Sequence, residues 1–189
     1  MKKIIIVNSS PRAKGNCAKA VEILQENITD AEIEVFNLRE KTVKPCMACG
    51  ACKAKDTAMC VQKDDMGALL ADIDSCDALV VATPIYYGTV NGPAKTFLDR
   101  TYPFFNPAKD NMSNATKFGK KVAIILTAGS MPRDVNLKQG EAYNCFDVAG
   151  FTESKVLSFN SEISGMDANI FSIEDDANQI KDLAKWLSE

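Results

Sequence analysis

The chain has 189 residues, of which 46% are hydrophobic and 25% charged, and its formal net charge at pH 7 is −3. This size and balance indicate one globular domain with an adequate core, and the negative charge argues against nucleic acid as a partner, because such binding normally needs a basic surface. Apolar runs such as 4–7 and 122–126 are far below the roughly 20 residues of a membrane span, and the first residues do not resemble a signal peptide, so we expect no membrane contact and a cytoplasmic location.

The first half of the chain alternates between predicted strands and helices. Residues 3–8 form an unbroken β-branched run, which predicts a fully buried strand. Apolar residues at helical spacing predict a helix over 15–28, and alternation predicts a half-buried edge strand over 32–38. Residues 45–63 form an irregular loop rich in cysteine, and a helix is predicted to follow over 64–76.

The second half continues the alternation. Its elements are predicted in the order strand, helix, long loop, strand, helix, strand and helix, over residues 77–84, 92–102, 103–119, 120–129, 137–150, 152–160 and 173–189. Five strands alternating with helices predict an α/β fold in which helices cover both faces of a parallel sheet. No repeat or linker divides the chain, so residues 1–189 are expected to form a single domain. Ligands of such sheets bind at the carboxyl ends of the strands, and the loops found there carry the functional information.

The loop after the first strand reads NSSPRAKGN, residues 8–16, and leads into the first helix. Its two serines and Arg12, together with the amide groups at the helix N-terminus, could cradle a phosphate, because the helix dipole favours an anion there. The stretch matches neither the G-x-G-x-x-G pattern nor a Walker loop. The alternative is a plain capped turn, since serine and asparagine favour such positions.

The loops after the next two buried strands have a different composition. After the strand over 77–84 the chain reads TPIYYGTVNGPAKTFLDR (83–100), and its paired tyrosines and glycine would suit a flat heteroaromatic ring. The alternative is that Tyr86 and Tyr87 merely cover the core. After the third buried strand, TAGSMP (127–132) supplies small residues that would let a ligand approach the backbone.

A phosphate site on one loop and a ring site on the next two indicate a mononucleotide lying along the edge of the sheet, and FMN fits that shape. The chain contains no histidine. Hydride transfer through a flavin needs no protein acid or base at its centre, because the cofactor carries the chemistry. The composition is therefore compatible with a redox flavoprotein.

These loops, with the cysteine cluster and the KDDM that follows it (63–66), resemble the NADPH-dependent FMN reductases, and more closely their iron–sulfur flavoprotein branch. The resemblance covers most of residues 3–130, and the stretch from Pro84 to Arg100 is its most specific part. It implies a flavodoxin-like three-layer sandwich with a five-stranded parallel sheet in the order 2-1-3-4-5. It also implies an NAD(P)H-dependent FMN oxidoreductase that uses NADPH or NADH as a transient donor and a small molecule or a protein as acceptor. A homodimer or homotetramer is implied as well.

The resemblance also assigns FMN-binding positions. The expected set is Ser9, Ser10, Pro11, Arg12, Gly15, Asn16 and Cys17 for the phosphate, and Pro84, Ile85, Tyr86, Tyr87, Gly88, Thr127, Ala128 and Gly129 around the isoalloxazine ring. The phosphate loop of the family usually reads Gly-Ser-Pro-Arg and then Gly-Asn-Thr, so Ser9 and Cys17 depart from it. Ser9 adds a hydroxyl, whereas Cys17 lacks the hydroxyl that contacts phosphate and could offer only its backbone amide. No catalytic side chain is expected, because the flavin carries the reaction.

Four of the seven cysteines lie between residues 46 and 60, at the spacing C-x2-C-x2-C-x7-C. The first three match the run that wraps an iron–sulfur cubane, and the fourth would close the site. The candidate ligands of a 4Fe–4S cluster are therefore Cys46, Cys49, Cys52 and Cys60. The lysines that could offset the negative charge of such a cluster are Lys44, Lys53, Lys55 and Lys63.

Three other interpretations of the cysteine loop stay open. It could hold a structural zinc ion, contain a dithiol pair such as Cys46 with Cys49, or hold no metal. The remaining features have structural explanations. Cys76 and Cys145 lie on apolar helix faces and are interpreted as core residues, and Asp64 is interpreted as a helix cap.

The main functional hypothesis is a redox flavoprotein. FMN would take a hydride from a nicotinamide, or electrons from a carrier, and pass them to a small acceptor or to the cluster. One alternative is a flavin-binding electron carrier without a substrate of its own. Another is a non-redox domain whose cysteine loop holds zinc or no metal.

Overall fold

The computed structural model describes residues 1–54, 56–129, 146–160 and 169–189. Its strands are β1 (Lys2–Asn8), β2 (Ala31–Asn37), β3 (Ala78–Tyr86), β4 (Thr89–Val90), β5 (Lys120–Ala128) and β6 (Phe151–Asn160). Its described α-helices are α1 (Asn16–Asn27), α2 (Met66–Ser75), α3 (Gly92–Arg100) and α5 (Glu174–Ser188). Apart from the helix predicted over 137–150, each expected strand and helix is present, and its ends lie close to the predicted ones.

The five long strands form one parallel sheet in the order β2-β1-β3-β5-β6. Counted along the chain this is the order 2-1-3-4-5, so the predicted flavodoxin-like topology is confirmed. Strand β2 lies at an edge, as its half-buried alternation predicts. Strand β4 was not predicted. It pairs antiparallel with the end of β3, so the loop that carries Tyr86 and Tyr87 is a hairpin and not an irregular segment.

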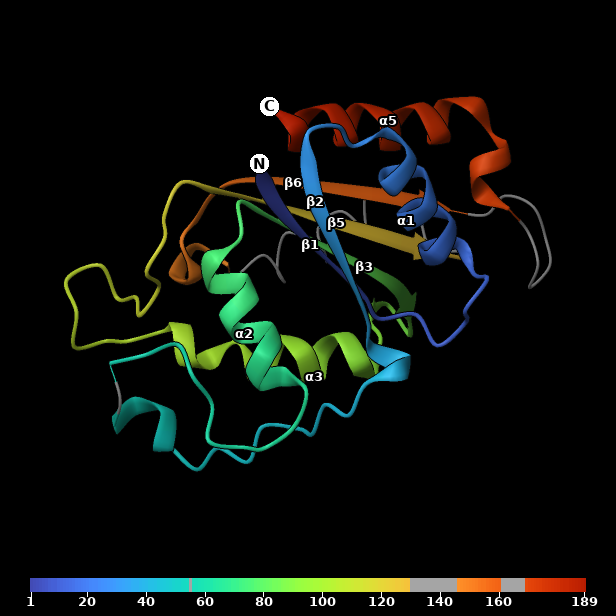
Figure 1. Cartoon of the computed structure of the whole chain (residues 1–189). Coiled ribbons are helices and arrows are strands. Elements are labelled where there is room, and N and C mark those ends of the chain that lie inside the picture. Colours follow the sequence, from blue (N-terminus) through green and yellow to red (C-terminus); the bar gives the residue numbers. More distant parts are fainter. Residues whose placement is uncertain (55, 130–145, 161–168) are drawn as a thin grey trace.

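Helices cover both faces of the sheet, with α1 and α5 on one face and α2 and α3 on the other (Figure 1). Side chains of β1 alternate between the two cores: Ile4 and Ile6 pack with α1 and α5, whereas Ile5 and Val7 pack with α2 and α3. Burial on both faces explains why this strand reads as an unbroken apolar run. Cys76 is buried in the core beside α2, so its interpretation as a core residue is confirmed.

The helix predicted over 137–150 falls largely outside the described residues, and so does Cys145. Its described end is a 3₁₀ turn, Asp147–Ala149, that closes at Gly150 with a φ of 87°. A Cβ at Gly150 would lie 2.1 Å from the Lys117 carbonyl oxygen, so the position requires glycine on two grounds. Over the residues that the structure describes, no helix is both long and apolar enough to cross a membrane.

The strand register brings the three ligand loops to one edge of the sheet. Asn8 at the end of β1 pairs with Ala82 in β3, and Pro84 pairs with Thr127 in β5. The loops that follow β1, β3 and β5 therefore leave the sheet side by side, as expected for the carboxyl ends of parallel strands. The cysteine loop lies elsewhere. In Figure 1 it runs below α2 and α3, away from the sheet.

Candidate functional site

The loop after β1 is tied to the sheet by buried polar contacts. The amide and the hydroxyl of Ser9 both donate to the Ala82 carbonyl oxygen, at 2.9 and 3.2 Å. The Ser10 amide donates to Asn8 Oδ1 at 3.1 Å, and the Arg12 amide donates to the Ser10 hydroxyl oxygen at 3.2 Å. Ser9 therefore uses its hydroxyl proton within the protein, and the Ser10 hydroxyl donates over a longer distance, 3.5 Å, to the Arg12 carbonyl oxygen.

Helix α1 begins without a side-chain cap. Gly15 is the N-cap residue and has no side chain that could cap the first turn. The Asn16 side chain is engaged elsewhere, since its Oδ1 accepts from the Ile170 amide at 3.2 Å. A Cβ at Gly15 would lie 3.1 Å from the Cβ of Arg12, so a larger residue would crowd the loop. The first amide groups of α1 thus lie at the positive end of the helix dipole, where an anion is favoured.

Cys17 connects the start of α1 to the loop after β5. Its Sγ lies 3.2 Å from Thr127 Oγ1 in a buried contact. Burial raises the pKa of the Cys17 thiol to about 11, and the lowering effects of Thr127 and Arg12 are smaller. The side chain is therefore a neutral thiol at neutral pH, and it brings no negative charge toward a phosphate at the helix N-terminus.

Asn91 connects the loop after β1 to the segment that follows β3, a role that was not predicted. It caps α3, because its Oδ1 accepts from the Ala94 amide at 3.1 Å. Its Nδ2 donates to the Ser9 carbonyl oxygen at 2.8 Å, and its Oδ1 also accepts from Thr83 Oγ1 at 3.3 Å. The signal in the sequence is the triplet NGP, an N-cap residue followed by a proline in the first helical turn.

The two tyrosines lie at the tip of the hairpin formed by β3 and β4. Tyr86 pairs with Thr89, so Tyr87 and Gly88 form a two-residue turn. Both turn residues have a positive φ, 52° and 74°, as in a type I′ turn. Tyr87 is fully exposed and Tyr86 is 45% exposed, so the interpretation of these rings as covers of the core is wrong for the single chain.

The other residues expected around a flavin ring lie at the same edge of the sheet. Pro84 and Ile85 are buried at the end of β3, and Thr127 and Ala128 are buried at the end of β5. Gly129 is exposed, and a Cβ there would meet no atom within 4 Å. The loops expected to hold the phosphate and the ring are thus brought together by the fold.

The four clustered cysteines line a single cavity of about 740 Å³. Cys46 and Cys49 are exposed, whereas Cys52 and Cys60 are half-buried. The turn around Cys49 has a positive φ at Ala48 (51°) and at Gly50, the residues on either side of it. The Ala48 amide donates to Cys46 Sγ at 3.4 Å. Over the described residues, no three cysteine, aspartate or glutamate side chains converge on a single point that could hold a metal ion. The four cysteines therefore line one cavity, but in this structure their side chains do not converge as the ligands of one metal ion would.

A buried ion pair holds together the two ends of the cysteine loop, Lys44 and Asp64, which we call its neck. Arg100 and Asp64 have side chains 1% and 0% exposed, and two N–H groups of the guanidinium donate to the carboxylate at 2.6 and 2.9 Å. Arg100 also donates to the Lys44 carbonyl oxygen at 2.7 Å. The hydrogen bond from Arg100 holds the pKa of Asp64 below its usual value. Asp64 was predicted to cap α2, but the N-cap residue is Asp65; Asp64 lies one residue earlier, accepts from the Met66 amide at 3.2 Å and pairs with Arg100, which was not predicted.

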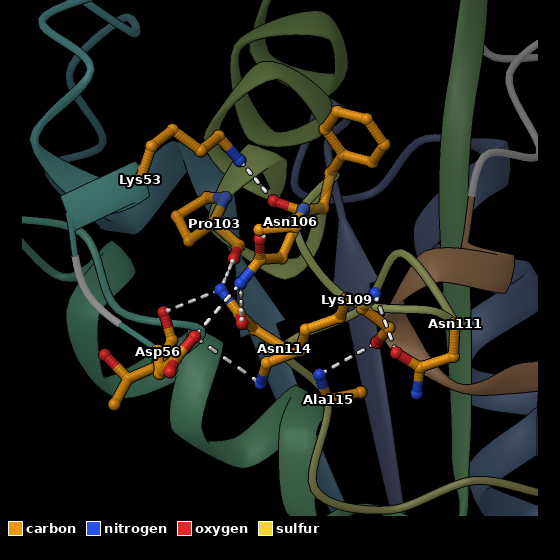
Figure 2. A network of polar contacts seen from close by, with 12 residues as sticks. Lys53, Asp56, Pro103, Asn106, Lys109, Asn111, Asn114 and Ala115 are labelled. Atoms are coloured by element: carbon orange, nitrogen blue, oxygen red, sulfur yellow. Dashed lines mark hydrogen bonds and ion pairs between the residues drawn. The ribbon is translucent and has the colours of Figure 1, made fainter.

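The long loop over 103–119 supports the segment between Cys52 and Cys60. Figure 2 shows Asp56, Asn106 and Asn114 converging beside Pro103. Asn106 Nδ2 donates to Asn114 Oδ1 at 2.8 Å and to Asp56 Oδ1 at 3.1 Å. Asn114 Nδ2 donates to the Pro103 carbonyl oxygen at 3.0 Å.

Lys53 adds a second contact between the cysteine loop and the residues at the start of the long loop. Its ammonium donates to the carbonyl oxygens of Tyr102, at 2.6 Å, and Phe105. It also lies 3.6 Å from the centre of the Tyr102 ring. Lys53 was expected to offset cluster charge, but its hydrogen bonds are made to backbone of the neighbouring segment. Arg100 is the cation that the fold buries beside the cysteines.

The chain matches the model of the NADPH-dependent FMN reductase family over residues 2–139. Among curated proteins it is similar to an iron–sulfur flavoprotein of Archaeoglobus fulgidus, with 35% identity over 104 residues, which are 54% of this chain and 46% of that protein. It is also similar to an iron–sulfur flavoprotein of Methanosarcina thermophila, with 34% identity over 103 residues, or 52% of each chain. The chain thus spans about half the length of the curated relatives it matches.

Solved structures share the fold across the whole chain. The NAD(P)H:quinone oxidoreductase of Methanothermobacter marburgensis superposes with a TM-score of 0.73 at 15% identity, covering 100% of this chain and 98% of that one. An FMN-dependent NADH-azoreductase of Bacillus anthracis, solved in complex with FMN, has a TM-score of 0.71 at 16% identity and full coverage of both chains. At these identities the likeness establishes the flavodoxin-like fold alone.

Proposed function

Because this chain belongs to the NADPH-dependent FMN reductase family, we propose that it is an NAD(P)H-dependent FMN oxidoreductase whose cysteine loop carries a 4Fe–4S cluster. FMN, when bound, supplies the hydride and electron chemistry, so the protein's part is to hold and orient it. The observation that carries the cluster proposal is the single cavity lined by all four cysteines. The names of the curated relatives favour the same combination of cofactors.

The residues at the end of β1 fit the phosphate of FMN. A phosphate monoester needs donors and positive charge. The uncapped N-terminus of α1 supplies amide groups and the positive end of a dipole, and Ser10 and Arg12 stand on the turn just before it. We assign the phosphate to Ser9, Ser10, Pro11, Arg12, Gly15, Asn16 and Cys17. In this set Ser9 and Asn16 act mainly through the backbone, because their side chains are already engaged.

The residues at the ends of β3 and β5 fit the isoalloxazine ring. They present exposed tyrosine rings on a hairpin and an exposed glycine at the end of β5, which would border the ring. We assign this part to Pro84, Ile85, Tyr86, Tyr87, Gly88, Thr127, Ala128 and Gly129. A nicotinamide would reach the ring from the exposed side and leave after transfer. A second protomer could cover the exposed tyrosines, in line with the proposed homodimer or homotetramer.

The cysteine loop fits an iron–sulfur cluster better than a zinc ion. Its first three cysteines are spaced by two residues, as in cubane-binding loops, whereas structural zinc usually takes two separated pairs. One amide already donates to a cysteine sulfur, and the buried Arg100 places positive charge beside the loop. Cys46, Cys49, Cys52 and Cys60 would be the ligands.

The test is anaerobic purification followed by an absorbance spectrum and analysis of iron, sulfide and zinc. We expect one flavin and about four irons per chain, and oxidation of NADPH or NADH with added FMN, quinone or dye. Fewer than about one iron per chain, or zinc in its place, would sink the cluster. Absence of flavin after incubation with FMN would sink the flavin site, and Arg12→Ala should weaken FMN binding without changing the iron content.

A second candidate is an electron carrier that exchanges electrons with a protein partner and has no substrate of its own. The exposure of Cys46 and Cys49 favours it, because a cluster held there would lie at the protein surface. Steady-state assays separate the two candidates. A pure carrier would show flavin and iron but negligible turnover of NADPH and NADH with every small acceptor tried.

A further inference from the structure

Arg100 has a hydrogen-bonding group that its known partners do not use. Its two terminal nitrogens are engaged by Asp64 and by the Lys44 carbonyl oxygen. Its Nε is buried, and among the described residues it has no hydrogen-bond partner. A buried N–H without a partner costs roughly 1–3 kcal/mol, so its position calls for an explanation.

The sulfur of Cys60 is the acceptor that we consider for this N–H group. Arg100 and Cys60 both line the cavity that holds the four cysteines. Cys60 is half-buried and packs against the core to which α3, the helix that ends at Arg100, contributes Phe97 and Leu98. A neutral thiol is a weak acceptor, but a thiolate that ligates iron is a strong one.

We propose that Arg100 is a positioning residue of the cluster site, whose Nε–H donates to the sulfur of Cys60 when that sulfur ligates iron. The inference rests on the proposed 4Fe–4S cluster. It assigns two tasks to one side chain. The terminal nitrogens hold the two ends of the loop together through Asp64 and Lys44, and Nε fixes the fourth ligand, which is separated from the third by seven residues, whereas two residues separate the first three.

The same geometry gives Arg100 an electrostatic effect on the cluster. A cubane with four thiolates carries net negative charge, and reduction adds one more negative charge. A fixed cation and an N–H···S hydrogen bond both favour the more negative state, so they raise the reduction potential. Lys53 cannot replace this contact, because its ammonium is held by the carbonyl oxygens of Tyr102 and Phe105.

Arg100→Lys is the decisive variant, because lysine keeps the positive charge near Asp64 but has no Nε–H. In anaerobically purified protein we expect the midpoint potential of the cluster, followed by electron paramagnetic resonance during a redox titration, to shift to a more negative value. We also expect iron content to fall below that of the wild type. The matched control is Arg39→Lys, which makes the same exchange in the pair with Glu40, outside the cavity, and should change neither quantity.

The outcomes separate this inference from the proposed function. An Arg100→Lys protein with wild-type iron content and an unshifted potential would overturn the role of Arg100 while leaving the cluster in place. A wild-type protein without iron would overturn the cluster and the role of Arg100 together.

Should Arg100→Lys fail to fold, as judged by lost flavin binding, the double variant Asp64→Asn/Arg100→Gln removes both buried charges at once. It should bind flavin and show a cluster that is lost or has a more negative potential. A wild-type potential in that protein would also overturn the inference.

Discussion

Cys17 is one of the two residues, with Ser9, at which the loop after β1 departs from the family pattern, and it gives the first prediction. Its thiol is buried against Thr127 and lacks the hydroxyl that would contact a phosphate. In Cys17→Ser, a hydroxyl can donate to a phosphate oxygen, and a hydrogen bond to a charged group contributes about 1.5–3 kcal/mol. We expect FMN to bind about tenfold more tightly, measured by quenching of flavin fluorescence. Cys17→Ala removes the sulfur without adding a donor and should show no gain; equal gains in both variants would contradict the argument.

Asp64 carries the second residue-scale prediction. Its pairing with Arg100 lowers its folded-state pKa below the ordinary 3.8. The stabilisation from this pair is therefore fully present above pH 4 and is lost as the pH falls through the folded-state pKa. Asp64→Asn leaves Arg100 as a buried charge without its counter-ion, which should lower the free energy of unfolding at pH 7 by about 3–5 kcal/mol.

Urea titrations of the wild type and Asp64→Asn at pH 7, 4 and 3 would check this dependence. The difference between the two proteins should shrink at the lowest pH, because below the ordinary pKa of 3.8 the unfolded wild-type chain takes up a proton on Asp64, which favours unfolding. Asp99→Asn, which removes an exposed carboxylate paired with Lys95, is the control and should cost at most about 1 kcal/mol. A difference that stays constant from pH 7 to pH 3 would show that the charge of Asp64 is not what matters.

At the scale of elements, helix α3 connects the two candidate sites. It starts at the flavin edge, where Asn91 caps it and binds the Ser9 carbonyl oxygen, and it ends at Arg100 in the neck of the cysteine loop. Nine residues of helix span about 13 Å, so the two sites are held at the two ends of one short rigid element. A change at the first turn of α3 can therefore be felt on the phosphate loop.

Asn91 allows its two contacts to be separated. Asn91→Asp keeps an acceptor for the Ala94 amide but loses the donor to the Ser9 carbonyl oxygen. We expect it to bind FMN several-fold more weakly, and its buried carboxylate opposite the Ser9 carbonyl oxygen should lower the free energy of unfolding as well. Asn91→Ala loses both contacts and should also cost about 1–2 kcal/mol as a lost cap. Thermal unfolding and FMN titration of the two variants measure this; equal FMN affinity in wild type and Asn91→Asp would refute the link to Ser9.

The hairpin between β3 and β4 gives a prediction in which stability and binding move in opposite directions. Tyr87 has a φ of 52°, a conformation that costs a residue with a Cβ about 1 kcal/mol, and its ring is fully exposed. Asparagine tolerates this conformation better, so Tyr87→Asn should raise the free energy of unfolding of the flavin-free protein by several tenths of a kcal/mol. It should also weaken FMN binding, because the ring is lost.

Tyr86→Asn is the control for the hairpin, since that position is extended and pairs with Thr89. It should weaken FMN binding without any gain in stability. Urea titration and flavin fluorescence again give the two numbers. A Tyr87→Asn protein that is no more stable than the wild type would show that the turn residue is not strained.

At the scale of the whole molecule, the sequence predicts the fold well because each core strand is buried on both faces. The runs in β1, β3 and β5 are apolar for that reason, and alternation with helices then fixes a parallel sheet. The contacts that shape the sites were not predictable in the same way. Asp64 and Arg100 are 36 residues apart, and Asn91 and Ser9 are 82 apart, and no local pattern joins such partners. The four cysteines were visible as a motif, but their separation around one cavity depends on the surrounding loops.

The cysteine loop contributes little to the hydrophobic core and is held to the rest of the chain mainly by polar contacts. The last prediction follows from this. Among its described residues only Ala58 is a buried hydrophobic residue, and Cys46 and Cys49 are exposed. Its anchors are polar contacts at the neck and along the long loop (Figure 2). Cys46→Ser/Cys49→Ser should therefore abolish iron binding yet leave FMN binding intact, with the melting temperature of the aerobically purified protein lowered by no more than about 4 °C, or roughly 1 kcal/mol.

A substitution in the hydrophobic core provides the comparison for this last experiment. Leu79→Ala in β3 opens a cavity beneath the fully buried centre of the sheet and should cost about 2–5 kcal/mol, with FMN binding and iron lost together as the domain loosens. If Cys46→Ser/Cys49→Ser behaved like Leu79→Ala, the loop would be part of one cooperative unit with the sheet. If it loses only iron, the sheet and the proposed flavin site fold without the proposed cluster, because among the described residues the loop contributes only Ala58, with Cys60 packed beside it, to the core and is otherwise held by polar contacts such as the buried Arg100–Asp64 pair.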